Sequence, residues 1–383
     1  MMDNFDLIRP YNDEEAREAL GWVSGRFYVN VMSRYLFPDR PVSTLATVLR
    51  NIKGVEDFQD KVMGPAVASV MEKTSDGLSW EGMEHLHRLS ASGRKFLLIS
   101  NHRDIVLDPA LIDYVMWKEG VATARLCVGS NLLGVKLVRE IMRSNKIITV
   151  MRGLSPRETF HASENLSTFI RASITSGESS VWIAQKEGRA KDGNDRTDQA
   201  VLKMLAMSGE SEFAADFEEL SIVPLTFSYE YESCDYLKAR EVYLRSLGPY
   251  KKKRMEDVRS ILTGITQDKG HVHLTIGEPL SAEEIGQTAA LKGNARFTAL
   301  RELLDRRIIS GYRLWKTNYM ARDIMDGTSR FADKYTPGEM AAFVQYVESS
   351  LDKIKKRERP DRDALRNIFL QIYGNPVSAV LKD

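Results

Sequence analysis

A histidine and two acidic residues follow one short apolar run of the sequence. Residues 95–100 have the length of a buried strand, and the next segment reads Asn-His-Arg-Asp-Ile-Val-Leu-Asp-Pro. It contains His102, Asp104 and Asp108. A carboxylate that orients an imidazole makes it a general base, which is the pair that activates a hydroxyl nucleophile. The alternative is a polar turn in which Asn101 and His102 satisfy backbone groups and Asp108 caps the next helix.

Two further strand ends carry arginine beside glycine, as Arg152-Gly153 in one segment and Glu187-Gly188-Arg189 in the other. A guanidinium offers forked donors that match a phosphate, and glycine lets the backbone approach a ligand closely. A carboxylate such as Glu187 can orient the neighbouring donors. Both segments are therefore candidate anion sites, although an arginine in an ordinary surface turn has the same local sequence.

Other catalytic and metal motifs are absent from the sequence. The triplet His-Arg-Asp that begins at His102 also starts the catalytic loop of protein kinases, but Pro109 stands where that loop has asparagine. No G-x-S-x-G, H-E-x-x-H or P-loop pattern occurs. His271 and His273 alternate along one apolar run with no third ligand in view, so polar positions on a half-exposed strand are the favoured interpretation. No metal site is predicted.

Six short apolar runs must position these residues: 95–100, 124–128, 147–150, 180–184, 221–228 and 271–276. Helical stretches separate them, and this alternation is typical of an α/β fold with a mostly parallel sheet sandwiched by helices. We expect that domain over residues 91–290, with helical N-terminal and C-terminal extensions at 1–90 and 291–383. Because open α/β sheets bind ligands at the carboxyl ends of their strands, the polar segments should meet there. Pro224 is typical of an edge or bulged strand.

The composition is that of an ordinary globular protein. Of 383 residues, 54 are Lys or Arg and 53 are Asp or Glu, and this balance argues against a dedicated nucleic-acid binder. No segment has the roughly 18 consecutive apolar residues of a spanning helix, and the first twenty residues resemble no targeting signal. Two cysteines favour a reducing compartment, so a cytoplasmic location is expected. The basic runs 251–254 and 353–357 could hold the protein on the inner, anionic face of a membrane.

The order of the polar segments resembles that of the glycerolipid acyltransferase family, which includes the glycerol-3-phosphate and 1-acylglycerol-3-phosphate acyltransferases. The resemblance covers roughly residues 90–285 and rests on Asn101-His102 with Asp108, Arg152-Gly153, Glu187-Gly188-Arg189 and Ile222-Val223-Pro224. The family pattern has four residues between His and Asp, whereas this sequence has five. We interpret the difference as one extra loop residue and expect Asp108, rather than Asp104, to orient His102.

The resemblance implies transfer of a fatty acyl group from acyl-CoA or acyl carrier protein to a hydroxyl of glycerol 3-phosphate or its 1-acyl derivative. His102 would be the general base and Asp108 would hold its tautomer; a positioned base contributes about 10²–10⁴-fold. The acceptor would be bound by Arg152, Arg189, Asn101, Gly153, Glu187 and Gly188. No metal or redox cofactor is implied. The alternatives are a catalytically silent lipid-binding or scaffolding protein, and an acyltransferase for another lipid acceptor.

Overall fold

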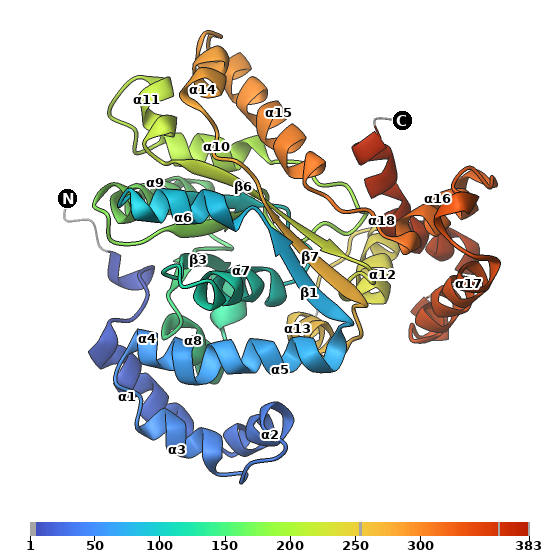
Figure 1. Cartoon of the computed structure of the whole chain (residues 1–383), viewed down its shortest axis with the longest axis horizontal. Helices are drawn as coiled ribbons and strands as arrows, with labels where there is room; N and C mark the ends of the chain where they lie inside the picture. Colours follow the sequence, from blue (N-terminus) through green and yellow to red (C-terminus); the bar gives the residue numbers. More distant parts are fainter. Residues whose placement is uncertain (1–4, 253–254, 359–360, 382–383) are drawn as a thin grey trace.

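A seven-stranded sheet forms the centre of the protein. The computed structural model (Figure 1) describes residues 5–252, 255–358 and 361–381. Its strands lie in the order β1-β7-β6-β2-β5-β3-β4. They are β1 (Gly77–Glu81), β2 (Leu97–Ser100), β3 (Arg125–Gly129), β4 (Ile147–Val150), β5 (Val181–Ala184), β6 (Ile222–Tyr229) and β7 (His271–Ile276). Neighbouring strands of this sheet are parallel except β6 and β7. The predicted mostly parallel sheet is therefore confirmed, and the carboxyl ends of β2 to β6 share one edge.

Helices cover both faces of the sheet, because successive side chains of a strand point to opposite sides. Leu98 of β2 enters one apolar core, while Leu97 and Ile99 enter the other. The first core includes α5 (Gly64–Thr74), α6 (Met83–Ala91) and α7 (Leu107–Lys118). The second includes α9 (Pro156–Thr175), α10 (Gln199–Ala206), α11 (Phe213–Glu218), α14 (Ala282–Ala289) and α15 (Asn294–Ser310). Strands buried on both faces read as continuous apolar runs, which is why the sequence revealed them.

The N-terminal helices form a smaller core of their own. They are α1 (Asp13–Ser24), α2 (Phe27–Leu36), α3 (Thr44–Arg50) and α4 (Val55–Phe58), and they lie below the sheet in Figure 1. Asn12 caps α1 in a capping box with Glu15, because the side chain of each accepts a hydrogen bond from the backbone N–H of the other. Short 3₁₀ helices occur at Phe5–Leu7, Ser130–Leu133, Ala332–Lys334 and Lys356–Glu358, and Gln59–Met63 is a π-helix.

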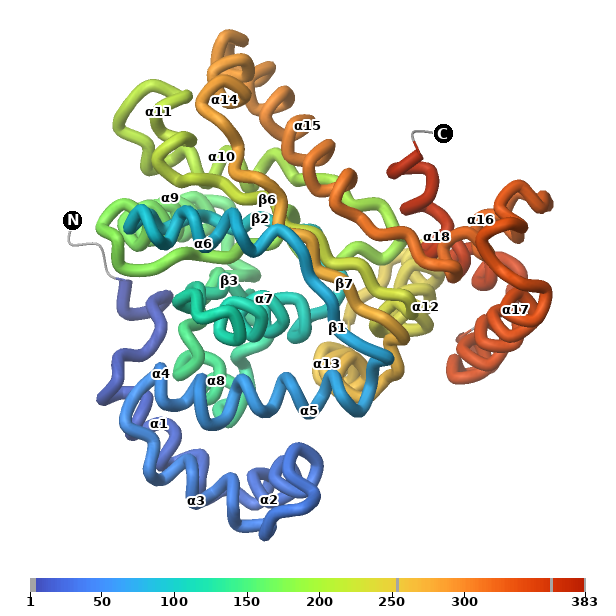
Figure 2. The backbone as a smooth tube through the Cα atoms, in the orientation of Figure 1, coloured from blue at the N-terminus to red at the C-terminus, as the bar shows by residue number. Residues whose placement is uncertain are grey.

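The C-terminal helices gather around α12 (Asp235–Ser246). Figure 2 shows α18 (Arg362–Leu381) beside α12, with α16 (Lys316–Asp326) and α17 (Pro337–Asp352) further out. Two shorter helices, α8 (Lys136–Arg143) and α13 (Glu256–Thr266), complete the described chain. None of the helices in its described residues is both long and apolar enough to cross a membrane.

Two domain boundaries differ from those expected. The region before residue 90 was predicted to be entirely helical, yet it contains β1, which pairs with β7 at the edge of the sheet. Side chains of β1 alternate between exposed and half-buried, so this strand has no continuous apolar run to reveal it. At the other end, α15 belongs to the sandwich rather than to a C-terminal extension, because Leu300, Leu303 and Leu304 lie in the second core.

The interpretation of Pro224 as a mark of an edge or bulged strand is wrong. Pro224 lies in β6, an interior strand between β7 and β2, where it pairs with Ile99. Pairing of β6 with β7 starts only at Leu225 and Ile276, so Pro224 stands just past the end of that ladder. Its carbonyl accepts a hydrogen bond from the N–H of Gly277 (2.8 Å). The N–H that proline lacks is therefore not needed at this position.

Candidate active site

His102 and Asp108 face each other at the carboxyl end of β2. Nδ1 of His102 lies 2.9 Å from Oδ2 of Asp108, which sits in the first turn of α7. The His102 side chain is 14% exposed and that of Asp108 is completely buried. Asp104 instead accepts from the N–H groups of Val106 and Leu107 (2.8 and 2.7 Å), so it holds the start of α7. The geometry therefore pairs His102 with Asp108, as expected despite the additional loop residue.

The Asp108 carboxylate has four hydrogen-bond partners among the residues that the structure describes. Besides His102, Oδ2 accepts from the N–H groups of Arg103 (2.5 Å) and Asp104 (2.8 Å). Oδ1 accepts from the hydroxyl of Tyr229 (2.7 Å), at the end of β6. Hydrogen bonds to the ionised form offset the cost of burying a carboxylate. Tyr229 was not predicted as a site residue, because an aromatic side chain in an apolar strand looks like ordinary core.

Asn101 is a structural residue, so its prediction as a substrate-binding residue is wrong. The side chain is completely buried. Its Oδ1 accepts from the N–H of Phe227 (2.8 Å), and its Nδ2 donates to the Phe227 carbonyl and to Asp195 (both 3.0 Å). These bonds join the end of β2 to β6 and to the segment after β5, and they hold the loop that carries His102.

A buried charge cluster lies directly behind His102. Nη1 of Arg103 donates to Glu232 (2.8 Å) and Nη2 donates to Asp195 (2.5 Å). Nζ of Lys238, on α12, donates to the second oxygen of Glu232 (2.7 Å). Burial alone would lower the pKa of Arg103, but the carboxylates of Asp195 and Glu232 raise it well above its usual value. The charges of two cations and two anions thus cancel in the interior. Their ion pairs hold Arg103, the residue next to His102, in place.

The loops after β4 and β5 meet through an ion pair between two predicted substrate-binding residues. Nη1 of Arg152 lies 2.6 Å from Oε2 of Glu187; the Arg152 side chain is half-buried and that of Glu187 is exposed. Gly153 and Gly188 have φ of +72° and +74°, a backbone conformation that residues with a side chain rarely adopt. The space where a Cβ atom would lie is open at both positions. The structure thus brings these four residues to the same edge of the sheet as His102.

Arg189 is buried and incompletely partnered. Its exposure is 8%, and Nη1 has no hydrogen-bond partner within the described parts of the chain. The next residue, Ala190, donates from its N–H to the His102 carbonyl (2.8 Å). A buried guanidinium with a free donor is costly unless a ligand satisfies it. Arg189 therefore fits the predicted role of an anion-binding residue close to His102.

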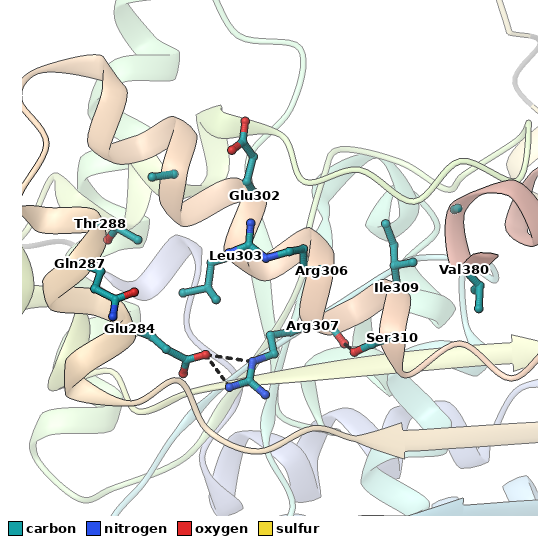
Figure 3. A pocket seen from close by; sticks show the side chains of 12 residues that line it. Glu284, Gln287, Thr288, Glu302, Leu303, Arg306, Arg307, Ile309, Ser310 and Val380 are labelled. Atoms are coloured by element: carbon teal, nitrogen blue, oxygen red, sulfur yellow. Dashed lines mark hydrogen bonds and ion pairs between the residues drawn. The ribbon is translucent and has the colours of Figure 1, made fainter. Parts of the chain in front are cut away.

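A separate cavity of about 570 Å³ lies between α14, α15 and α18 (Figure 3). Glu284 and Arg307 form an ion pair in its wall. None of the predicted site residues lines it. This cavity is therefore not part of the His102 site.

His271 and His273, for which no metal site was predicted, do not converge on one site. His273 is buried and its Nδ1 lies 2.8 Å from the Ser79 hydroxyl. His271 is exposed and its Nδ1 lies 2.6 Å from Glu230, with Asp76 also within 4.8 Å. Exposed groups of this kind are common without a metal, and we assign none here. The thiols of Cys127 and Cys234 are buried, and burial raises the pKa of Cys127 to about 12.

Comparison with known proteins gives this site its context. Residues 78–228 match the family model described as Acyltransferase, a span that runs from β1 to β6 and holds His102, Asp108 and the arginine loops. The chain carries an acyltransferase-family domain. This match confirms the resemblance to acyltransferases that the order of the polar segments indicated. The matched span begins in β1, before the predicted boundary at residue 91.

A curated protein and a solved structure are similar to this chain. A glycerol-3-phosphate acyltransferase from Alteromonas mediterranea is 24% identical over 234 residues, which are 61% of this chain and 26% of that protein. The chain thus corresponds to about a quarter of that relative's length. The crystal structure of the 1-acyl-sn-glycerophosphate (LPA) acyltransferase PlsC from Thermotoga maritima matches with a TM-score of 0.40 and 14% identity, covering 77% of this chain and 92% of that one.

Proposed function

We propose that the protein transfers a fatty acyl group from a thioester to a hydroxyl of a glycerol phosphate, either glycerol 3-phosphate or its 1-acyl derivative. The observation that carries the proposal is the contact of His102 with Asp108 at the carboxyl edge of the sheet, inside the acyltransferase-family domain. The acyl donor is acyl-CoA or acyl carrier protein. The named relative that acts on glycerol 3-phosphate supports this class of acceptor.

The chemistry follows from the orientation of the imidazole. Nδ1–H of His102 donates to Asp108, so the lone pair of Nε2 accepts the proton of the acceptor hydroxyl. The hydroxyl oxygen attacks the thioester carbonyl, a C–O bond forms, and the C–S bond breaks. The imidazolium then returns its proton to the departing thiolate. Asp108 holds the tautomer and stabilises the imidazolium while it exists.

We assign binding of the acceptor phosphate to Arg152 and Arg189, in the loops after β4 and β5. Arg189 offers a buried Nη1 that has no partner among the described residues, and Arg152 offers a partly exposed guanidinium that is paired with Glu187 in the free protein. Arginine binds phosphate through two parallel hydrogen bonds, which also fixes the orientation of the acceptor. Gly153 and Gly188 leave room for that group beside the backbone.

An anionic membrane surface is proposed as a partner, on the cytoplasmic side. Phe27, Tyr28 and Val31 of α2 are 76%, 65% and 54% exposed. Residues 25–50 carry four arginines and one aspartate. Exposed aromatic side chains beside basic residues suit the interface of an anionic bilayer. Of the basic runs predicted for this role, Lys251, Lys252 and residues 355–357 are exposed, whereas Lys253 and Arg254 lie outside the described residues.

A thiol-release assay tests the reaction. Acyl-CoA and acyl carrier protein donors are each combined with glycerol 3-phosphate, 1-acylglycerol 3-phosphate or unphosphorylated glycerol. We expect thiol release with a phosphorylated acceptor and its loss in His102→Ala, with the circular dichroism spectrum unchanged. No release with any pair, or full activity of H102A, would overturn the proposal and favour a catalytically silent lipid-binding protein.

Sedimentation with vesicles tests the membrane surface. We expect binding to anionic phosphatidylglycerol vesicles at low salt that weakens at high salt. The combined variant F27S, Y28S and V31S should lose it, whereas L291S, which changes an exposed leucine elsewhere (46%), should not. Equal binding of both variants, or no binding of the wild type in either salt, would contradict the assignment.

A further inference from the structure

Tyr229 approaches the His102 and Asp108 pair from the opposite side of the carboxylate. It is the last residue of β6, and its side chain is completely buried in the first core. Its hydroxyl donates to Oδ1 of Asp108 at 2.7 Å, while His102 contacts Oδ2 of the same carboxylate. One carboxylate thus joins a tyrosine of the sheet to the histidine of the site.

The two oxygens of Asp108 are held very differently. Oδ2 is contacted by Nδ1 of His102 and by the N–H groups of Arg103 and Asp104. Oδ1 has one hydrogen-bond partner in the described part of the chain, Tyr229. Without that hydroxyl, a buried carboxylate oxygen would have no donor, and its charge would be stabilised less. Tyr229 therefore fixes the rotation of the carboxylate about its last torsion.

The surroundings of Tyr229 keep its hydroxyl protonated, so that it can donate a hydrogen bond. Burial, followed by the charges of Asp108, Asp104 and Glu232, raises the pKa of Tyr229 well above its usual value. The hydroxyl thus retains its proton throughout the range in which a histidine titrates. The opposing cation is Arg103, whose guanidinium is occupied by Asp195 and Glu232 rather than by Asp108.

We propose that Tyr229 is a positioning residue of the active site: its hydroxyl holds the Asp108 carboxylate so that Oδ2 faces Nδ1 of His102 and sets how readily the imidazole accepts a proton. The inference rests on the proposed function for its kinetic consequence. The effect of Tyr229 on proton binding by His102 does not depend on which reaction the site performs.

The test compares Tyr229→Phe with Tyr243→Phe. Tyr243, on α12, is the control because it is 2% exposed and its hydroxyl is also hydrogen-bonded: it accepts from the N–H of Asp361 (2.9 Å). In Y229F the carboxylate loses a donor, so it attracts the imidazolium proton more strongly. We expect the His102 midpoint in an NMR titration of the free protein to rise by about 0.5–1 pH unit. Y243F should titrate like the wild type.

The kinetic readout uses the same variants. The acid limb of the kcat/KM profile should move upward with the His102 midpoint in Y229F, and kcat should fall about tenfold with the acceptor KM unchanged. If no variant or wild type turns over any substrate, the proposed function fails while the NMR titration still decides the role of Tyr229. An unchanged His102 midpoint in folded Y229F would overturn the inference.

A second variant covers the case in which Y229F does not fold. Replacing Tyr229 by 3-fluorotyrosine keeps the ring and the hydroxyl but makes the hydroxyl a stronger donor. The His102 midpoint should then move down, opposite to Y229F. A midpoint equal to that of the wild type would overturn the inference in this arm as well.

Discussion

Nη1 of Arg152 lies 2.6 Å from Oε2 of Glu187, so the loops after β4 and β5 are joined by an ion pair across the predicted substrate site. A bound phosphate competes with Glu187 for this guanidinium. Arg152→Ala should therefore raise the KM for the phosphorylated acceptor about tenfold or more, because a hydrogen bond to a charged group is lost. Arg157→Ala, which changes an exposed arginine on α9, should leave KM unchanged. Steady-state kinetics with varied acceptor measure both, and equal KM values in R152A and wild type would remove Arg152 from the site.

Because Asp108 and Asp104 make different contacts, substitutions at the two positions should have different effects on activity and stability. Asp108→Ala removes the partner of His102, so activity should fall by at least about 10²-fold while the His102 loop loses its anchor. Asp104→Ala removes the acceptor for Val106 and Leu107 at the start of α7, which should cost about 1 kcal/mol of stability but retain most activity. Acyl transfer and urea unfolding are measured on both. The reverse pattern, with D104A inactive and D108A active, would show that the assignment is wrong.

The buried charge cluster behind His102 should be sensitive to the loss of one member. Glu232 is completely buried and faces both Arg103 and Lys238. Glu232→Ala leaves two cations without this partner in the interior, so the free energy of unfolding should fall by about 3–5 kcal/mol. Glu302→Ala breaks an exposed pair with Arg301 and should cost less than about 1 kcal/mol. Urea unfolding distinguishes them, and similar losses in the two variants would contradict the expected effect of burial.

Asp113 should make stability depend on pH near neutrality. Burial raises its pKa from 3.8 to about 7 in the folded protein, and Oδ2 has no hydrogen-bond partner among the described residues. The folded state holds this proton more tightly than the unfolded state. The stabilisation is therefore complete below pH 3.8 and is lost as pH rises through 7. Between pH 5.5 and 7.5 the free energy of unfolding should fall on the order of 1–3 kcal/mol.

Asp113→Asn provides the comparison for that dependence. The amide stays neutral at every pH and can still accept the hydrogen bond from the N–H of Ala124 (3.0 Å). The difference in stability between D113N and wild type should therefore grow in favour of the variant as pH rises. Urea unfolding at several pH values measures it, and parallel curves for the two proteins would rule out Asp113 as the titrating group.

The sequence predicted those parts of the fold and site that depend on neighbours along the chain. Buried strands such as β2 and β5 appear as apolar runs, and the spacing of His102 and Asp108 permits a contact within one loop. Contacts between distant segments were not visible. Tyr229 is 121 positions from Asp108, and nothing in its own segment distinguishes it from core. The role of Asn101 was misjudged for the same reason, because its partner Phe227 is 126 positions away.

The edge strand β1 has a consequence for synthesis of the chain. Its single neighbour in the sheet is β7, and Ser79 lies 194 positions before the residue it pairs with, His273. During translation, β1 and the core around α5 and α6 leave the ribosome long before β7 exists. Contacts of such wide separation form late and slow folding. A nascent chain that stops before β7 is made would hold the His102 loop but present β1 unpaired, so completion of the sheet must await synthesis of residues 271–276.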